Sequence, residues 1–531
     1  MSLFVFFKDA RLVFKLDALS REILGIALPS ALAVAADPLA SLIDTAFIGH
    51  LGPVELAAAG VSIALFNQAS RITIFPLVSI TTSFVAEEDT IERMNIKASK
   101  NIDDAKLSGI ETPKNQLLQD IENGKIHKEN IDVEKYAANN DTNVEDDSKT
   151  NACKHDSSIT NGNKSKDKDG KKKRHIASAS TALLFGTMLG LIQTTILIFG
   201  AKLLLAAMGI KHDSPMLKPA VKYLRLRAFG SPAVLLSLAM QGIFRGFKDV
   251  TTPLYVILSG YALNVILDPI LIFYLKLGLN GAAISHVFSQ YLMAFTLLVL
   301  LMRKVYILPP SLKDLQIFRF LKNGGLLLAR VVAVTFCMTF AASLAARLGS
   351  VPMAAFQPCL QIWLTSSLLA DGLAVAVQAI LACSFTEKDY KKTTAAATRA
   401  LQMSFVLGMG LSILVGIGFY FGAGIFSKDV HVVHLIKIGI PFVAATQPIN
   451  SLAFVFDGVN YGSSDFAYSA YSLVMVSVVS IVTEFFLYRS KQFIGIWIAL
   501  TIYMILRMFA GIWRMGTATG PWRYLRTSSL P

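Results

Sequence analysis

The sequence predicts an all-α polytopic membrane protein with twelve transmembrane helices in two parallel six-helix lobes. Hydrophobic residues make up 53% of the 531 residues, charged residues make up only 16%, and the mean hydropathy is +0.53. A soluble chain of this length would need two or three domains and far more surface charge. Long apolar runs also recur along the chain, and short motifs of its first part return in its second part.

Twelve apolar runs have the length that a bilayer demands of a helix. We predict spans at 21–48, 54–86, 176–208, 219–245, 253–275, 279–303, 317–346, 353–384, 393–422, 430–456, 464–488 and 493–515. The first six form an N-lobe (21–303) and the last six a C-lobe (317–515). Residues 88–175 contain no apolar run and are rich in Lys, Asp, Asn and Ser, so we expect a disordered loop inserted between the second and third spans.

Short motifs repeat between the two lobes. Residues 50–58 resemble 347–355, and residues 244–247 resemble 456–459. The two motifs of the second pair are separated by fewer residues than those of the first pair, and the difference is about the length of the polar insertion. This indicates that both lobes share one plan and that only the first lobe carries the insertion. Since each lobe crosses the membrane an even number of times, both lobes start from the same side and the repeat is parallel.

Basic residues predict which side of the membrane each connection faces. They precede the first span, fill the long loop and follow the sixth and eighth spans, which places both termini and the loop in the cytosol. The net charge of +14 therefore reflects loops rather than a nucleic-acid partner. We expect an interfacial segment at 1–20, a cytosolic linker at 304–316 and a cytosolic tail at 516–531, while the basic segment 211–227 is an exception on the opposite side.

The four cysteines predict no special chemistry. Cys153, Cys337, Cys359 and Cys383 lack the spacing of a metal site, and three of them lie in apolar spans. We interpret them as reduced packing residues. No metal, no other cofactor and no enzymatic nucleophile–base pair is expected.

Two acids, Asp37 and Asp44, lie inside the first apolar run. Seven residues at about 100° each place both on one helix face, about 10 Å apart along the axis. A charge at membrane depth costs at least about 2.5–3.5 kcal/mol, so acids kept there usually face a polar interior and have a function. The alternative is one acid that reaches the interface and one that is simply hydrogen-bonded.

A second polar cluster lies in the fifth and sixth spans. Asn264 and Asp268 share one helix face, and Ser285 and His286 open the sixth span. Together with Asp44, these side chains would form one dry pocket that binds a proton on one side of the membrane and releases it on the other. A polar core that never titrates is the alternative.

The cations at membrane depth suggest how a substrate is held. Arg71, with Gln68 close to it in the second span, has a guanidinium suited to a carboxylate, although an ion pair with a neighbouring helix is equally compatible. Further candidate substrate-binding residues are Arg330, Asp371, Gln378 and Lys437, and Arg507 is another cation near membrane depth. Several buried cations favour an anionic substrate, whereas the acids alone would favour a cationic one.

Three motifs resemble those of the MATE (multidrug and toxic compound extrusion) family: IDTAFIGHLG in the first span, FRGFKDVTTP after the fourth and NVILDPILIF in the fifth. The segments FNQASRITIFPLVSITTSFVAEED and PMAAFQPCLQIWLTSSLLADGLAVAVQAILACSF look more narrowly like the plant citrate-exporting branch. The resemblance covers the chain outside the long loop.

The resemblance implies two lobes that rock around a central cleft, with family site residues at Asp44, Asn264 and Asp268. His286 stands where the family usually has a small polar residue. A proton-coupled antiporter that exports citrate across the plasma membrane, with a role in iron or aluminium homeostasis, is the implied function. Cationic or neutral metabolites and xenobiotics are the alternative cargo, and a membrane receptor or scaffold that recruits partners through the long loop is an alternative of another class.

Overall fold

The computed structural model describes residues 17–107, 174–207, 213, 215–306, 317–426 and 430–527. The N-lobe consists of α1 (Ala18–Gly49), α2 (Pro53–Leu107), α4 (Ala177–Ala207), α5 (Leu217–Ala228), α6 (Ser231–Gly246), α7 (Thr251–Pro269), the π-turn η4 (Ile270–Tyr274) and α8 (Leu279–Lys304). The C-lobe consists of α9 (Ile317–Arg347), α10 (Ser350–Thr386), α11 (Tyr390–Phe426), α12 (Val430–Ala445), α13 (Gln447–Gly462), α14 (Phe466–Gly516), the 3₁₀ turn η5 (Gly520–Arg523) and α15 (Tyr524–Thr527). Two strands of two residues each are β1 (Arg174–His175) and β2 (Val305–Tyr306).

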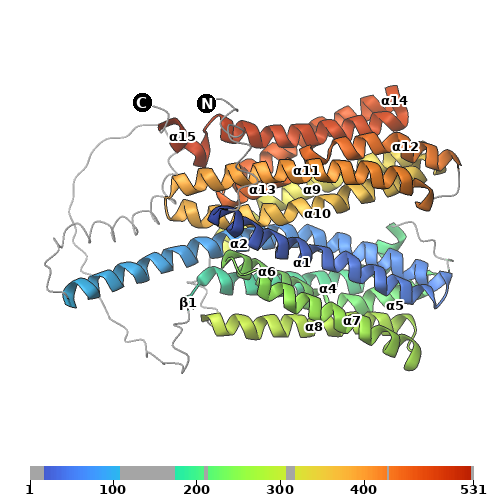
Figure 1. The fold of residues 1–531 in the computed structure, drawn as a ribbon. Helices are drawn as coiled ribbons and strands as arrows, with labels where there is room; N and C mark the ends of the chain where they lie inside the picture. The colour runs from blue at the N-terminus through green and yellow to red at the C-terminus, as the bar shows by residue number, and fades with distance from the viewer. Residues whose placement is uncertain are drawn as a thin grey trace, which may run out of the picture. The chain divides into compact units, whose positions relative to one another are not determined.

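These helices confirm the all-α polytopic architecture. In the described chain, eight helices are long and apolar enough to cross a membrane, and the bent pairs α5–α6 (45°) and α12–α13 (47°) each provide a further span. Helix α14 turns at Gln492 (φ 50°, ψ −124°), so its two arms correspond to the predicted spans 464–488 and 493–515, and α2 covers the predicted span 54–86. The helices of each lobe gather in a group of their own (Figure 1).

One predicted boundary differs from the structure. Helix α2 continues to Leu107, so the polar segment expected as a loop from residue 88 begins as helix. Residues 88–107 contain neither proline nor glycine, and polar residues end a membrane span without ending a helix. The expected interfacial segment lies mostly outside the described residues, as do 108–173 of the loop and most of the linker.

Equivalent close helix contacts confirm that the two lobes share one plan. A Cβ on Gly190 would lie 2.5 Å from the Cα of Pro232, and a Cβ on Gly408 would lie 2.4 Å from the Cα of Pro448. The first contact joins α4 to the start of α6, and the second joins α11 to the start of α13. Each glycine therefore allows the third span of its lobe to touch the second arm of the bent fourth span. These arms are α6 in the N-lobe and α13 in the C-lobe.

The register of the repeat differs by one helical turn from the predicted alignment of 244–247 with 456–459. Gly242 and Gly246 of α6 face α2, whereas Gly458 and Gly462 of α13 face α10 in the same way. Gly246 therefore corresponds to Gly462 and not to Gly458. The short motif misled because Phe-x-Gly ends at the second packing glycine of α6 (Gly246) but at the first packing glycine of α13 (Gly458).

The first helix of each lobe begins in the core of the other lobe. Ile23 and Ile26 at the start of α1 are buried among side chains of α10, α11 and α13, while Ile48 near its end belongs to the N-lobe core. Phe320 and Leu327 at the start of α9 are likewise buried among N-lobe side chains, including Phe84. Both lobes thus exchange the first turns of their opening helices.

The lobes meet closely at the end of the bundle where α1 begins, which we call the closed end. Gln378 of α10 donates to the main-chain oxygen of Ser79 (2.8 Å) and to the hydroxyl of Ser83 (3.0 Å) on α2. Ser83 in turn donates to the main-chain oxygen of Tyr461 on α13 (2.8 Å). An ion pair between Arg319 and Glu87 (2.6 Å) adds a contact between α9 and α2 at this end.

Candidate functional site

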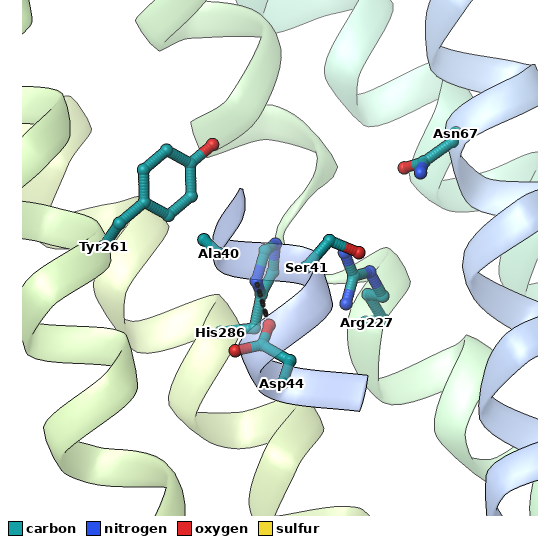
Figure 2. Close-up of a pocket in the computed structure, with 7 residues that line it drawn as sticks. All are labelled: Ala40, Ser41, Asp44, Asn67, Arg227, Tyr261 and His286. Carbon is teal, nitrogen blue, oxygen red and sulfur yellow. Dashed lines mark ion pairs between the residues drawn. The ribbon is translucent and has the colours of Figure 1, made fainter. Parts of the chain in front are cut away.

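Asp44 is the centre of a buried polar network in the N-lobe. Asn264 Nδ2 donates to Asp44 Oδ1 at 2.7 Å, and the Ser285 hydroxyl donates to Asn264 Oδ1 at 3.3 Å. His286 Nδ1 faces Asp44 Oδ2 at 3.9 Å, which is too long for a direct hydrogen bond but allows electrostatic contact (Figure 2). The structure therefore brings together, around one carboxylate, four of the side chains that the sequence predicted to meet.

The backbone of α7 and α8 explains how these side chains come so close. Pro269 has no N–H to donate within the helix, and the chain widens from there into the π-turn η4. A Cβ on Gly281 would lie 2.7 Å from the carbonyl carbon of Leu271 in this turn. Only glycine allows α8 to start against the widened turn, which places Ser285 beside Asn264.

Asp268 lies one turn after Asn264 and is also buried, beside Asp44 and Ser285. Within the described part of the chain, neither of its carboxylate oxygens has a hydrogen bond of good geometry. A buried carboxylate without donors is costly, whereas a proton on one oxygen would supply a donor. The network thus contains two neighbouring carboxyls, of which Asp268 has no donor of good geometry among the described residues.

A small pocket opens onto this network and contains a cation that the sequence analysis did not select. It is lined by Ala40, Ser41, Asp44, Asn67, Arg227, Tyr261 and His286 (Figure 2). Arg227 ends α5, is buried, donates to the Tyr223 hydroxyl (3.1 Å) and lies over the Phe66 ring (5.3 Å). Arg227 belongs to the basic segment 211–227. The sequence FGSP at 229–232 breaks the fourth span just after it, and this break was the sequence signal that could have identified Arg227.

Three predicted site residues lie on described helices, but their side chains lie outside the described residues. These are Asp37 on α1 and Gln68 and Arg71 on α2. Their assignment to proton coupling or substrate binding remains a prediction from the sequence.

The C-lobe contains a second charged cluster, in which two arginines share one acid. Arg330 of α9 and Arg507 of α14 both pair with Oδ2 of Asp457 on α13. Arg330 lies 5.0 Å from the centroid of the Tyr461 ring, and Arg507 lies 4.5 Å from that of Phe454. Arg330 was predicted as a substrate-binding residue, whereas its partner Asp457 was missed.

The other predicted residues of the C-lobe do not all join this cluster. Asp371 of α10 is within electrostatic reach of Asp457 and Arg507, and also of Arg245 in the N-lobe. Gln378 holds α2 at the closed end. Lys437 lies on an exposed face of α12 with its ammonium 5.2 Å from the Tyr420 ring, so the structure does not bring it to the arginines.

The C-lobe also contains a fully buried acid that sequence reasoning missed. Glu484 of α14 accepts a hydrogen bond from the Cys337 thiol at 3.2 Å, and its other oxygen has no partner among the residues described. The alignment of residues 50–58 with 347–355 sets Ala341 and Val334 opposite Asp44 and Asp37, so this alignment does not identify the C-lobe acids. The acids of the C-lobe helices stand elsewhere: Asp371 on α10 and Asp457 on α13 are partly buried, and Glu484 on α14 is fully buried.

Comparisons with known proteins decide the family. The family model described as MatE matches residues 169–270 and 327–486. Protein DETOXIFICATION 43 of Arabidopsis thaliana is 62% identical, with 99% of this chain and 96% of that protein covered. Protein DETOXIFICATION 42 of the same plant is 56% identical, with 99% and 97% covered. The chain belongs to the MatE family.

A solved structure supports the MatE fold independently. The crystal structure described as MATE in the bent conformation superposes with a TM-score of 0.72 over 98% of both chains, at 16% sequence identity. MatE proteins are membrane transporters that move small organic substrates and couple this movement to ion gradients. The chain is therefore a multi-pass secondary transporter and not an enzyme.

Proposed function

We propose that this MatE transporter is a proton-coupled antiporter that exports citrate or a similar organic anion. The observation that carries the proposal is the buried network of Asp44, Asn264, Asp268 and His286, in which the Asp268 carboxyl lies beside Asp44 without a donor of good geometry among the described residues. Such a pair favours one shared proton, and a proton gained or lost there changes the hydrogen bonds between α1 and α7.

The position of Asp44 on α1 links protonation to the arrangement of the lobes. This helix begins in the C-lobe core and ends in the N-lobe network. A proton that binds Asp44 more tightly in one arrangement of the lobes must favour that arrangement. The closed end contains the start of α1, and the basic residues that precede this helix favour a cytosolic orientation of that end; the plasma membrane is the location that we propose.

The sign of the buried charges supports an anionic cargo. Arg330 and Arg507 outnumber Asp457, the acid that pairs with both, and the nearby Asp371 is also within reach of Arg245. In the N-lobe pocket, Arg227 lies beside Asp44. A guanidinium binds a carboxylate through two parallel hydrogen bonds, and citrate offers three carboxylates. By the same likeness to the citrate-exporting branch, the exported citrate would serve iron or aluminium homeostasis.

A cationic or neutral cargo is the second candidate. It is favoured by the carboxyls of Asp44 and Asp268 beside the N-lobe pocket, because an organic cation could compete there with the proton. Inhibition of transport by organic cations, and not by citrate, would select this candidate.

Efflux of labelled citrate from proteoliposomes with an imposed pH gradient tests the proposal. We expect Asp44→Asn to abolish the dependence on the gradient and Arg330→Gln to raise the KM for citrate. Lys437→Gln removes one positive charge from an exposed position and is the matched control. Efflux at the wild-type rate and pH dependence in Asp44→Asn would remove the role assigned to the network.

A further inference from the structure

The C-lobe cluster presents more hydrogen-bond donors than its resident acid can satisfy. Arg330 and Arg507 each carry five N–H groups, and both direct a terminal nitrogen at the same oxygen of Asp457. Across the described residues, the Nε atoms of both arginines and the hydroxyl of Tyr503 are buried without a hydrogen-bond partner. Tyr503 stands one turn before Arg507 and within electrostatic reach of both arginines.

The arginines have supports besides Asp457. The Tyr461 ring lies against the Arg330 guanidinium, and the Phe454 ring lies against that of Arg507. The side-chain exposure is 7% for Arg330, 10% for Arg507 and 15% for Asp457. Asp457 is thus the most exposed of the three side chains, and an aromatic ring lies against each guanidinium.

We propose that Asp457 is a tethered stand-in for a carboxylate of the cargo, and that the cargo binds the two arginines by displacing it. This inference rests on the proposed anionic cargo. An incoming carboxylate brings acceptors for the two Nε donors and the Tyr503 hydroxyl, none of which Asp457 satisfies. Release of the cargo then follows when Asp457 returns to the arginines.

The covalent attachment of Asp457 to the chain determines which anions can compete with its carboxylate for the two arginines. Because Asp457 is held beside the arginines, its effective concentration is high, and a free monocarboxylate must displace it with a single group. A di- or tricarboxylate makes additional contacts and can succeed. The site therefore selects polycarboxylates such as citrate over acetate, through a competitor that belongs to the chain.

Binding to the full-length protein in nanodiscs tests this, with citrate, malate and acetate as probes. We expect Asp457→Asn to bind citrate about tenfold more tightly than the wild type and to acquire measurable binding of acetate. In efflux experiments its KM for citrate should fall, and its maximal rate should fall too because release slows. Asp465→Asn is the matched control, since Asp465 pairs with Arg514 of α14 (2.7 Å) at a site apart from the cluster.

A second variant covers the case in which Asp457→Asn does not fold. Asp457→Asn/Arg507→Gln keeps the net charge of the cluster and leaves Arg330 without its competitor, so it should also bind acetate. Unchanged or weaker binding of citrate in the folded variants, with no binding of acetate, would overturn the inference.

The same measurements separate this inference from the proposed function. If wild-type efflux ignores the pH gradient while Asp457→Asn still tightens the binding of carboxylates, proton coupling fails and the stand-in role holds. If proton-driven citrate efflux is present and Asp457→Asn leaves carboxylate binding unchanged, the stand-in role alone fails.

Discussion

Gly372→Ala should open the closed end of the transporter. A Cβ on Gly372 of α10 would lie 2.6 Å from the main-chain oxygen of Ala27 and 2.8 Å from the Cβ of Ala31, both on α1. Helices α1 and α10 would have to separate by roughly 0.8 Å to restore an ordinary contact, because packed interiors hold little free space. Such overpacking costs about 1–3 kcal/mol. This overpacking destabilises only the conformation in which the two helices touch. The ratio of molecules closed at this end to molecules open there should therefore fall about 5- to 150-fold.

A native cysteine reports this change. Cys383 of α10 is 8% exposed and packs against Ala86 of α2 at the closed end. In a variant that retains only this cysteine, we expect maleimide to label it faster by about the same factor after Gly372→Ala. Gly410→Ala is the control, because a Cβ there meets nothing within 4 Å. Equal labelling rates in the two folded variants would refute the reasoning.

Three further predictions concern stability. Asn264→Ala removes the donor to Asp44 and should lower the free energy of unfolding by about 1–3 kcal/mol in thermal denaturation, a value that an unchanged melting temperature would contradict. Burial opposes the charge of Asp249, but hydrogen bonds, chiefly from Lys304, outweigh it and hold the pKa of Asp249 below its usual range. Its stabilising effect is thus full above about pH 4 and is lost as the pH falls toward the lower folded value, so Asp249→Asn should flatten the acid end of a stability-versus-pH curve. Gly458→Ala would place a Cβ 2.3 Å from a main-chain oxygen of α10 and should reduce the yield of monodisperse protein in size-exclusion chromatography, unlike an alanine at an uncrowded helix position.

The spans were predictable from the sequence because the thickness of a bilayer fixes the length of an apolar run. Hydropathy reports where a span ends, however, and not where a helix ends. Helix α2 therefore continues past the predicted boundary through residues that are polar but form helix well.

The N-lobe network was largely predictable because Asp44 is an acid inside an apolar run and because Asn264 and Asp268 share a helix face. The family resemblance pointed to the same three residues. Arg227 was not predicted, since a basic residue beside a helix break cannot be distinguished from a loop charge without the bend between α5 and α6. Asp457 was missed although it lies in one of the repeated motifs, and the repeat was aligned one turn away. That alignment paired the acid with Arg245, whereas the packing glycines pair it with Gln241.

The exchange of opening turns between α1 and α9 has a consequence for the history and folding of the chain. A single lobe made alone would leave the apolar start of its first helix, such as Ile23 and Ile26 in the N-lobe, without the surface that covers it. Two copies of such a lobe would each cover the helix start of the other, in the manner of a domain-swapped dimer. The present chain contains both lobes, each covering the helix start of the other, so a protein cut within residues 307–316 should assemble only when both fragments are synthesised together.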